Sequence, residues 1–219
     1  MKITKFHTGI ALTTSLLLAA LTGCGAANTA SSSGSASSST SVSASSNSAK
    51  KHTSFFVKDN GDGTKVIKDI DGKEVTVPTN PERIADLWHA NNQVVLLLGG
   101  AEKLVSTTTN VKSLAWFKQV YPGIEKVDAP VKGTDVNMEQ LLADKPEVLL
   151  ASSKEQIAKA ADAGIPAVHV EFQNFADLKR TVELTAEVIG TDEAIERAEK
   201  YLAYLEKNEN LIKERLQGI

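Results

Sequence analysis

The stretch RIADLWHANNQVVLLLGGAEKLVSTT, residues 83–108, decides the fold of this chain. It starts with a short apolar-biased run, 83–87, and continues with a long apolar block, 91–98, that two glycines end. A β-branched run, 104–108, follows. This pattern predicts a strand, a helix and a second strand. Because the joins are short, we expect the two strands to be parallel neighbours in one sheet.

The predicted carboxyl ends of these two strands are the first indication of a functional site. In open parallel sheets, ligands bind just beyond the carboxyl ends of the strands. Here those ends carry Trp88, His89, Thr108, Thr109 and Asn110. We therefore expect these residues to lie close together and to face a ligand.

The N-terminus, residues 1–23, has the pattern of a secretory signal. A basic start is followed by an apolar core that is too short to span a membrane as a helix. Leu21-Thr22-Gly23-Cys24 closes this segment, and Cys24 is the only cysteine in the chain. An ordinary signal peptide that happens to contain a cysteine is the alternative. A lone cysteine in a secreted chain has no disulfide partner, so we favour lipidation of Cys24, as in the lipobox of bacterial lipoproteins.

Residues 24–50 are predicted to be a lipidated cysteine followed by a flexible tether. The segment is almost entirely Ser, Ala, Thr, Gly and Asn, which cannot bury enough apolar area to fold. The chain holds 24 basic and 27 acidic residues, a net charge of −3, and removal of Lys2 and Lys5 with the signal gives −5. With no basic face or basic aromatic stripe, nucleic acid is not an expected partner.

Residues 51–190 are predicted to form an α/β lobe with a mainly parallel sheet flanked by helices. Up to Pro78, two Asp-Gly pairs between β-prone runs indicate a small antiparallel hairpin structure. Its acidic cluster lacks the ligand spacing of a calcium loop, so turn chemistry is the better interpretation. Beyond residue 108, helices and strands alternate. The predicted helices are 113–121, 137–145, 154–163 and 174–189, and the further strands are 147–151 and 166–170.

Residues 191–219 are predicted to form one long amphipathic helix. Apolar residues recur every three or four positions from Ala194 to Leu216, and oppositely charged pairs four apart mark its solvated face. Such a helix extends for roughly 40 Å, longer than a small domain needs.

In this order, the lipobox, the Ser-rich tether and four further segments resemble bacterial ABC-transporter substrate-binding lipoproteins of the iron–siderophore, haem and cobalamin class. The four segments are DIDGKEVTVPTNPERIADL, GGAEKLVSTT, VNMEQLLADKPEVLLAS and AGIPAVHV, and the long helix follows them. The resemblance implies a ligand held between two α/β lobes that one long helix joins. It also implies delivery to a membrane permease driven by an ATPase, at the outer face of the cytoplasmic membrane.

Members of this class are much longer than this chain, which ends within the helix that would join the lobes. We therefore expect the N-terminal lobe plus a truncated inter-lobe helix. A fragment, an interrupted gene and a second lobe on a separate polypeptide all remain open. A lone lobe offers only half of a clamp.

We expect the ligand to be an iron chelate, a siderophore or haem, bound without a separate cofactor. Aromatic side chains suit large, partly apolar chelates, while hydroxyls and amides fix their orientation. Where cobalamin-binding relatives carry aromatic residues this chain offers polar ones, which disfavours cobalamin, and Lys132 could face an anionic chelate. Core packing is the alternative role for each aromatic residue. The full expected set is Trp88, His89, Thr108, Thr109, Asn110, Trp116, Lys132, Ser152, Ser153 and Phe172.

Binding of a bare zinc or manganese ion is the second hypothesis. His89 with Glu171 or His169 could contribute ligands, but such a site needs about four. His89 could also serve as an axial haem ligand. A third possibility is a truncated surface lipoprotein that binds no solute.

Glu139 lies in Asn137-Met138-Glu139-Gln140-Leu141, which matches the motif whose glutamate pairs with permease arginines in the family. An acidic residue in the first helical turn is also favoured by the helix dipole alone. The resemblance favours permease docking. No nucleophile elbow, phosphate-binding glycine loop or paired His/Glu motif is present, so we expect no enzymatic activity.

Overall fold

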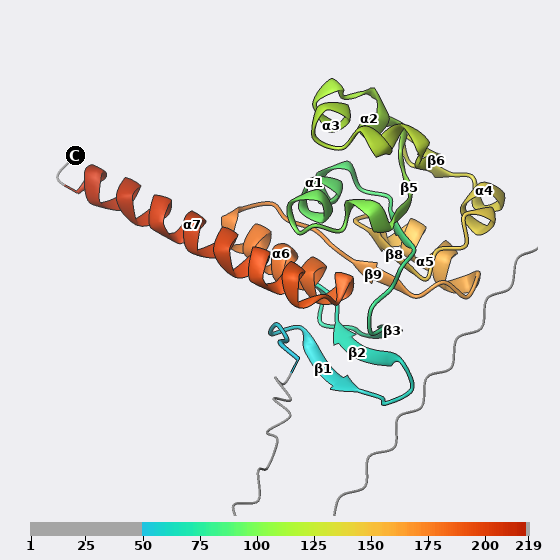
Figure 1. The fold of residues 1–219 in the computed structure, drawn as a ribbon, viewed down its shortest axis with the longest axis horizontal. Coiled ribbons are helices and arrows are strands. Elements are labelled where there is room, and N and C mark those ends of the chain that lie inside the picture. Colours follow the sequence, from blue (N-terminus) through green and yellow to red (C-terminus); the bar gives the residue numbers. More distant parts are fainter. Residues whose placement is uncertain (1–49, 218–219) are drawn as a thin grey trace, which may run out of the picture. The chain divides into compact units, whose positions relative to one another are not determined.

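The computed structural model describes residues 50–217, which contain two β-sheets and the helices that pack on them (Figure 1). The predicted signal, the lipidation site and the predicted tether up to residue 49 lie outside the described residues, as do the last two residues, 218 and 219, of the predicted final helix. The smaller sheet comprises β1 (Phe56–Asp59), β2 (Thr64–Lys68) and β3 (Glu74–Pro78). The larger sheet comprises β4 (Ile84–Asp86), β5 (Leu104–Thr108), β6 (Asp128–Lys132), β7 (Asp135–Val136), β8 (Val148–Ala151) and β9 (Ala167–His169). The helices are α1 (His89–Leu97), α2 (Thr109–Ser113), α3 (Ala115–Val120), α4 (Met138–Ala143), α5 (Lys154–Asp162), α6 (Phe175–Ile189) and α7 (Asp192–Leu216), with short 3₁₀ turns at Ala101–Lys103 and Pro122–Lys126.

The smaller sheet confirms the predicted antiparallel structure and the turn role of its aspartates. Strands β1, β2 and β3 pair in sequence order, each antiparallel to the next. Asp59 and Asp62 each accept a hydrogen bond from a backbone N–H two residues on, and Asp69 accepts from the N–H groups of Asp71 and Lys73. These carboxylates therefore stabilise turns, as short acidic side chains commonly do.

The larger sheet confirms the predicted α/β class, and its strand order shows where a ligand would be expected. The order is β7-β6-β5-β4-β8-β9, with every pair parallel except β6 and β7. The chain moves outward from β4 through β5 to β6, then returns to the other side of β4 through β8 and β9. The carboxyl ends of β4 and β8 therefore flank the topological switch point.

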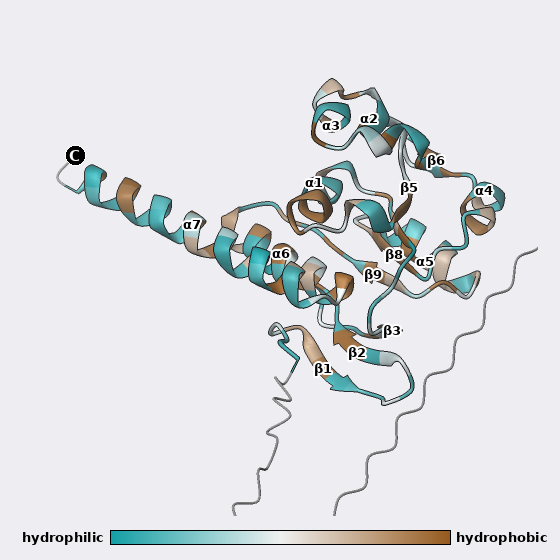
Figure 2. Cartoon of the chain, in the orientation of Figure 1, coloured by the Kyte–Doolittle hydropathy of each residue, from teal (hydrophilic) through white to brown (hydrophobic). Residues whose placement is uncertain are grey.

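Alternation along the strands produces a core on each face of the larger sheet. In β8, Val148 and Leu150 belong to the cluster that includes residues of α1, α6 and α7, whereas Leu149 and Ala151 belong to the cluster with Leu141 of α4 and other residues. The same alternation in β4 places Ile84 in the first cluster and Ala85 in the second. Figure 2 shows hydrophobic residues concentrated in α1 and the central strands, while the outer part of α7 is mostly hydrophilic with isolated hydrophobic positions.

Two predictions beyond β5 need correction. The helix expected over 113–121 is present as the shorter α3, and a further helix that was not predicted, α2, precedes it; Leu114 separates the two because it is extended, with φ −83° and ψ 114°. Strands β6 and β7 were not predicted at all. Pro130 and the charged residues at both ends of β6 conceal its short apolar pattern. Asn137 and Asn174, the residues at which two of the predicted helices begin, are confirmed as N-caps by hydrogen bonds from backbone N–H groups to their side chains. Thr191 caps α7 in the same way.

Helix α6 ends at Gly190, as predicted, for a steric reason. Gly190 has φ 77°, and a Cβ atom there would lie 2.1 Å from the carbonyl oxygen of Thr79. Only glycine permits this close approach, which brings the start of α7 beside the segment that leads into β4. Among residues 50–217, no helix combines the length and the apolar character that crossing a bilayer requires.

A buried ion pair joins the first described residues to α6. Lys65 of β2 is fully buried and its Nζ lies 3.0 Å from Oε1 of Glu187. His52 and the backbone N–H of Thr53 also contact the Glu187 carboxylate, at 3.0 and 2.8 Å. Burial disfavours the charge on Glu187, but attraction to Lys65 and these hydrogen bonds outweigh it, so the pKa of Glu187 is lowered. The small sheet is therefore held to the lobe by charge pairing as well as by apolar contact.

Candidate functional site

A hollow of about 230 Å³ lies at the carboxyl edge of the larger sheet, at the switch point. It brings together seven of the ten residues predicted to bind a ligand, contributed by the segments after β4, β5 and β8. Its other wall comes from the end of β6 and from α5. The lining residues are Leu87, Trp88, His89, Thr108, Thr109, Asn110, Gly133, Thr134, Ser152, Ser153 and Gln156.

Trp88 is placed by the tight junction between β4 and α1. It is the extended N-cap residue of α1, with φ −125° and ψ 115°, and it makes no side-chain cap. Its backbone N–H instead donates to Oδ1 of Asp86, at 3.1 Å. Asp86 is fully buried, and burial raises the pKa of its carboxyl well above the usual range although Trp88 and Asn91 both donate to it. The half-buried Trp88 thus follows a buried strand end and is hydrogen-bonded to it through its backbone N–H.

Hydroxyl side chains at the next two strand ends begin the helices that follow them. Thr108 accepts a hydrogen bond from the N–H of Val111, at 3.2 Å, at the start of α2. Ser153 accepts from the N–H of Gln156, at 3.4 Å, at the start of α5. Both capping residues line the hollow, so the amino ends of these helices lie at its wall.

The hollow has the electrostatic character of a site for an anion. Its lining contains hydroxyls, amides, an indole and one imidazole, and none of these described residues is Asp or Glu. Helices α1 and α5, each of nine residues, begin at its wall. The partial positive charge at a helix amino end stabilises a nearby negative charge. A ligand with an anionic group is therefore favoured over a cation.

Three predicted residues lie outside this hollow. Phe172 packs against Trp88, with ring centroids 4.8 Å apart, and lines a separate, mainly apolar hollow of about 430 Å³ beside α1 and α7. Lys132 is exposed at the end of β6, immediately before Gly133. Trp116 is stacked on Phe117 in α3, with centroids 3.8 Å apart, and lines neither hollow. Ligand contact through Trp116 is therefore not supported by its position.

Gly133, Thr134 and Gln156 also line the hollow, although the sequence did not predict them as site residues. Gly133 and Thr134 follow β6, the strand that was not predicted, so their place at a strand end was not visible. Gln156 is buried and donates to the carbonyl oxygen of Thr134, at 3.3 Å, which links α5 to this loop. The glycine after Val131-Lys132 is the one sequence signal that could have marked a strand end there.

The histidines do not assemble a metal site in the part of the chain that the structure describes. His169 is buried, and its ring nitrogens contact Oδ2 of Asp71, at 3.0 Å, and the carbonyl oxygen of Ser152, at 3.2 Å. It therefore joins β9 to a turn of the smaller sheet. His89 is exposed at the hollow, and Glu171 accepts from Gln173 outside it. Within residues 50–217 no group of three or more His, Cys, Asp or Glu residues could hold a metal ion.

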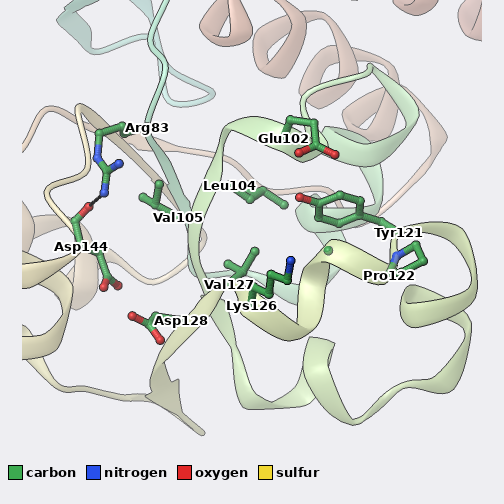
Figure 3. Close-up of a pocket in the computed structure, with 11 residues that line it drawn as sticks. Arg83, Glu102, Leu104, Val105, Tyr121, Pro122, Lys126, Val127, Asp128 and Asp144 are labelled. Atoms are coloured by element: carbon green, nitrogen blue, oxygen red, sulfur yellow. Dashed lines mark hydrogen bonds between the residues drawn. The ribbon is translucent and has the colours of Figure 1, made fainter. Parts of the chain in front are cut away.

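A larger hollow, of about 570 Å³, lies at the opposite, amino edge of the sheet (Figure 3). In contrast to the first, it is lined by charges of both signs: Arg83, Lys126, Glu102, Asp128 and Asp144. Arg83 is occupied by hydrogen bonds to the carbonyl oxygens of Asp144 and Lys145. Ser106 donates to Oδ2 of Asp144, at 2.6 Å. Two of its five charged side chains, Arg83 and Asp144, are thus hydrogen-bonded within the protein.

Comparison with known proteins identifies the family. Residues 84–219, more than half of the chain, match the family described as periplasmic binding protein. This chain belongs to that family. The periplasmic binding protein lobe seen here carries its hollow at the carboxyl strand edge, where ligands of open α/β sheets bind.

Two curated relatives resemble this periplasmic binding protein along part of their length. The uncharacterized ABC transporter substrate-binding lipoprotein YvrC of Bacillus subtilis (strain 168) is 27% identical over 193 residues, which cover 85% of this chain and 53% of YvrC. The molybdate-binding protein MolA of Haemophilus influenzae is 26% identical over 114 residues, covering 50% of this chain and 32% of MolA. The chain thus spans about half, or less, of the length of these relatives.

Solved structures show the same fold. A periplasmic solute binding protein from Veillonella parvula superposes with a TM-score of 0.63 at 25% identity, covering 69% of this chain and 47% of that one. MolA from Haemophilus influenzae, bound to molybdate, superposes with a TM-score of 0.64 at 24% identity, covering 71% and 54%. These similarities confirm the α/β architecture with its mostly parallel sheet.

Proposed function

We propose that this chain is the solute-capturing component of an ABC importer, and that it binds an anionic metal chelate, a ferric siderophore or haem. The observation that carries the proposal is the hollow at the switch point. Seven residues from three strand ends converge there, and no carboxylate is among its described lining residues. A ferric chelate with acidic groups would be stabilised by hydroxyl and amide donors and by the amino ends of α1 and α5.

The aromatic pair beside the hollow favours a chelate with apolar parts. Trp88 and Phe172 form a continuous wall from the polar hollow to the apolar one beside α1 and α7. The polar hollow alone, at about 230 Å³, is smaller than the roughly 300–1,000 Å³ typical of small-molecule sites. A large chelate would therefore be only partly enclosed by these residues and would lie against Trp88.

A free oxyanion is the second candidate. The relative MolA is named as a molybdate-binding protein. A tetrahedral oxyanion would fit within the small polar hollow and would use its hydroxyl groups without needing the aromatic wall. The two candidates differ in their dependence on Trp88, and this difference separates them experimentally.

The importer role requires attachment to the membrane and docking to a permease. We propose that Cys24 carries a lipid anchor at the outer face of the cytoplasmic membrane. We propose that Glu139 pairs with a basic residue of the permease. Glu139 is exposed in the first turn of α4, where Asn137 caps the helix through a hydrogen bond from the N–H of Gln140, at 3.1 Å. An exposed carboxylate on a well-ordered helix end can form such a pair without rearrangement.

Isothermal titration calorimetry of the full chain in detergent tests the proposal. The probes are a ferric catecholate siderophore, haemin, cobalamin, molybdate, Zn²⁺ and Mn²⁺. We expect saturable binding of the siderophore or haemin that Trp88→Ala weakens and Trp116→Phe leaves unchanged. Molybdate binding that is insensitive to Trp88→Ala would support the second candidate.

Two results would overturn the proposal. One is the absence of saturable binding of the siderophore, haemin and molybdate by a folded sample. The other is binding of Zn²⁺ or Mn²⁺ alone, which would restore the bare-metal hypothesis. Thermal unfolding monitored by circular dichroism establishes in each case that the sample is folded.

A further inference from the structure

A fully buried polar network lies directly beneath Trp88. Asp86, Asn91 and Asn92 are each 0% exposed. The Asp86 carboxyl accepts from the Trp88 N–H at Oδ1, at 3.1 Å, and from the Asn91 amide at Oδ2, at 3.0 Å. Both partners are neutral, so this carboxyl is held by hydrogen bonds alone.

A second arm of the network holds the peptide unit on the other side of the Trp88 Cα atom. The Asn92 amide donates to the carbonyl oxygens of Asp86, at 2.9 Å, and Trp88, at 3.0 Å. Both the N–H and the C=O of Trp88 are therefore bound by buried side chains. Rotation of the Trp88 backbone would break at least one of these hydrogen bonds.

Both arms are anchored in neighbouring elements. Thr185 of α6 donates to the Asn91 oxygen, at 3.0 Å, and Thr107 of β5 donates to the Asn92 oxygen, at 2.7 Å. Thr107 immediately precedes Thr108, which lines the hollow. The network thus ties β4, α1, β5 and α6 together at the base of the site.

Burying so many polar groups in one place adds little to the stability of the fold, which suggests another role for them. Buried amides and carboxyls gain little over apolar side chains of the same size, even when every hydrogen bond is made. A satisfied buried network does, however, fix one conformation. We propose that Asp86, Asn91 and Asn92 are positioning residues that hold the Trp88 indole in the orientation that contacts the ligand. This inference rests on the proposed ligand site, although its structural part is testable without any ligand.

The hydrogen-bonding capacities predict which substitutions the network tolerates. In Asp86→Asn, the new amide oxygen still accepts from the Trp88 N–H, and its NH₂ group faces Asn91. A flipped Asn91 amide would accept this bond and donate to the Thr185 hydroxyl, which can also act as an acceptor. Asp86→Ala has no such rescue, because it leaves the Trp88 N–H and the Asn91 amide without a buried acceptor.

Trp88 itself reports on its orientation. The chain contains two tryptophans, so Trp116→Phe leaves Trp88 as the only one. In this background, the full chain is compared with Asp86→Ala, Asp86→Asn and Thr107→Val. Ser106→Ala is the matched control, because Ser106 is the adjacent buried hydroxyl of β5 but bonds to Asp144 at the opposite edge. The measurements are the fluorescence anisotropy and emission maximum of Trp88, acrylamide quenching, thermal unfolding, and calorimetric titration with haemin, a ferric catecholate siderophore and molybdate.

We expect Asp86→Ala and Thr107→Val to lower the anisotropy of Trp88, shift its emission to longer wavelength and increase its quenching. Asp86→Asn and Ser106→Ala should leave all three near the starting values. Affinity for the bound chelate should fall about tenfold in Asp86→Ala, which corresponds to one lost buried hydrogen bond. Thr107→Val removes only the hydrogen bond from Thr107 to Asn92. If Asp86→Ala does not fold, the comparison of Thr107→Val with the starting protein decides the test.

The inference is overturned if folded Asp86→Ala or Thr107→Val shows unchanged Trp88 fluorescence, or if Ser106→Ala alters it equally. Either result would mean that the network serves stability alone. If the starting protein binds none of the three probes, the proposed function fails, while the fluorescence comparison still decides whether the network positions Trp88.

Discussion

The two edges of the larger sheet carry hollows of opposite character. The hollow at the amino edge is the larger, about 570 Å³ against about 230 Å³, and is lined by charged side chains. The hollow at the carboxyl edge is lined by hydroxyls, amides and Trp88, which the network beneath it holds in place. Size alone would select the amino edge. The strand order and the uncharged polar lining favour the carboxyl edge as the ligand site.

The difference follows from the geometry of a parallel sheet. At the carboxyl edge β4, β5 and β8 each run into a helix, so capping residues and the amino ends of helices collect there. At the amino edge the preceding helices end, and charged side chains pair with exposed backbone carbonyls, as Arg83 does. Contacts within the fold thus account for Arg83 and Asp144 in the charged hollow, and helix capping accounts for Thr108 and Ser153 in the uncharged one.

The sharpest test of this comparison is Trp88→Ala. Aromatic anchors commonly contribute 2 kcal/mol or more to binding, so we expect affinity for a chelate to fall about thirtyfold. Lys126→Ala, at the amino edge, should leave the affinity unchanged. Calorimetric titration of both variants with haemin and a ferric siderophore provides the measurement. An equal loss in Lys126→Ala would show that the wrong edge has been chosen.

A second test places a carboxylate in the uncharged hollow. Asn110→Asp changes shape very little but adds a negative charge, so an anionic ligand should bind about tenfold more weakly, and less so at high salt. Glu102→Gln removes a negative charge from the amino edge and should have no effect. Titration at two ionic strengths checks both. Tighter binding to Asn110→Asp would show that the ligand is a cation.

Sequence reasoning located the carboxyl edge because two signals agreed there. Apolar runs of strand length marked β4, β5 and β8, and the polar residues that followed them could be assigned to one edge once the strands were taken as parallel. The wall formed by Gly133 and Thr134 was missed because β6 is short and contains Pro130, so local pattern and tertiary structure disagree. Trp116 was included because its predicted helix follows one of the strand-end loops, and in the structure it stacks on Phe117.

The buried network could not have been predicted in the same way. Asn91 and Asn92 open the apolar block 91–98, where amides indicate only a helix start. Their function depends on Thr107 and Thr185, which only the folded structure brings to them. His169 is a similar case, because its bond to Asp71 joins residues of different sheets.

A smaller effect is expected at His89. It is exposed at the start of α1 and belongs to no metal-binding group in the described part of the chain. His89→Ala should therefore change the affinity for a siderophore by less than about threefold, the effect of one exposed contact. Titration of this variant with haemin provides the sharper comparison. A much greater loss of affinity for haemin alone would identify His89 as an axial ligand. Zn²⁺ binding by the parent protein that His89→Ala abolishes would support the metal hypothesis.

The smallest effect concerns the amino edge, where Asp144→Asn should alter stability and leave binding unchanged. Burial raises the pKa of the Asp144 carboxyl, and nearby Asp128 raises it further, while the hydrogen bond from Ser106 acts in the opposite direction. A carboxyl whose pKa is raised on folding stabilises the protein below its unfolded pKa, near 3.8, and this contribution is lost as pH rises through the folded value. The asparagine variant lacks this loss, so its stability should exceed that of the parent at neutral pH, by less than about 1 kcal/mol. Urea unfolding of both proteins from pH 4 to 7 measures the difference in the free energy of unfolding, which should grow with pH. A difference that shrinks with pH would mean that the fold stabilises Asp144 as the anion. The charged hollow would then be better suited to a cation.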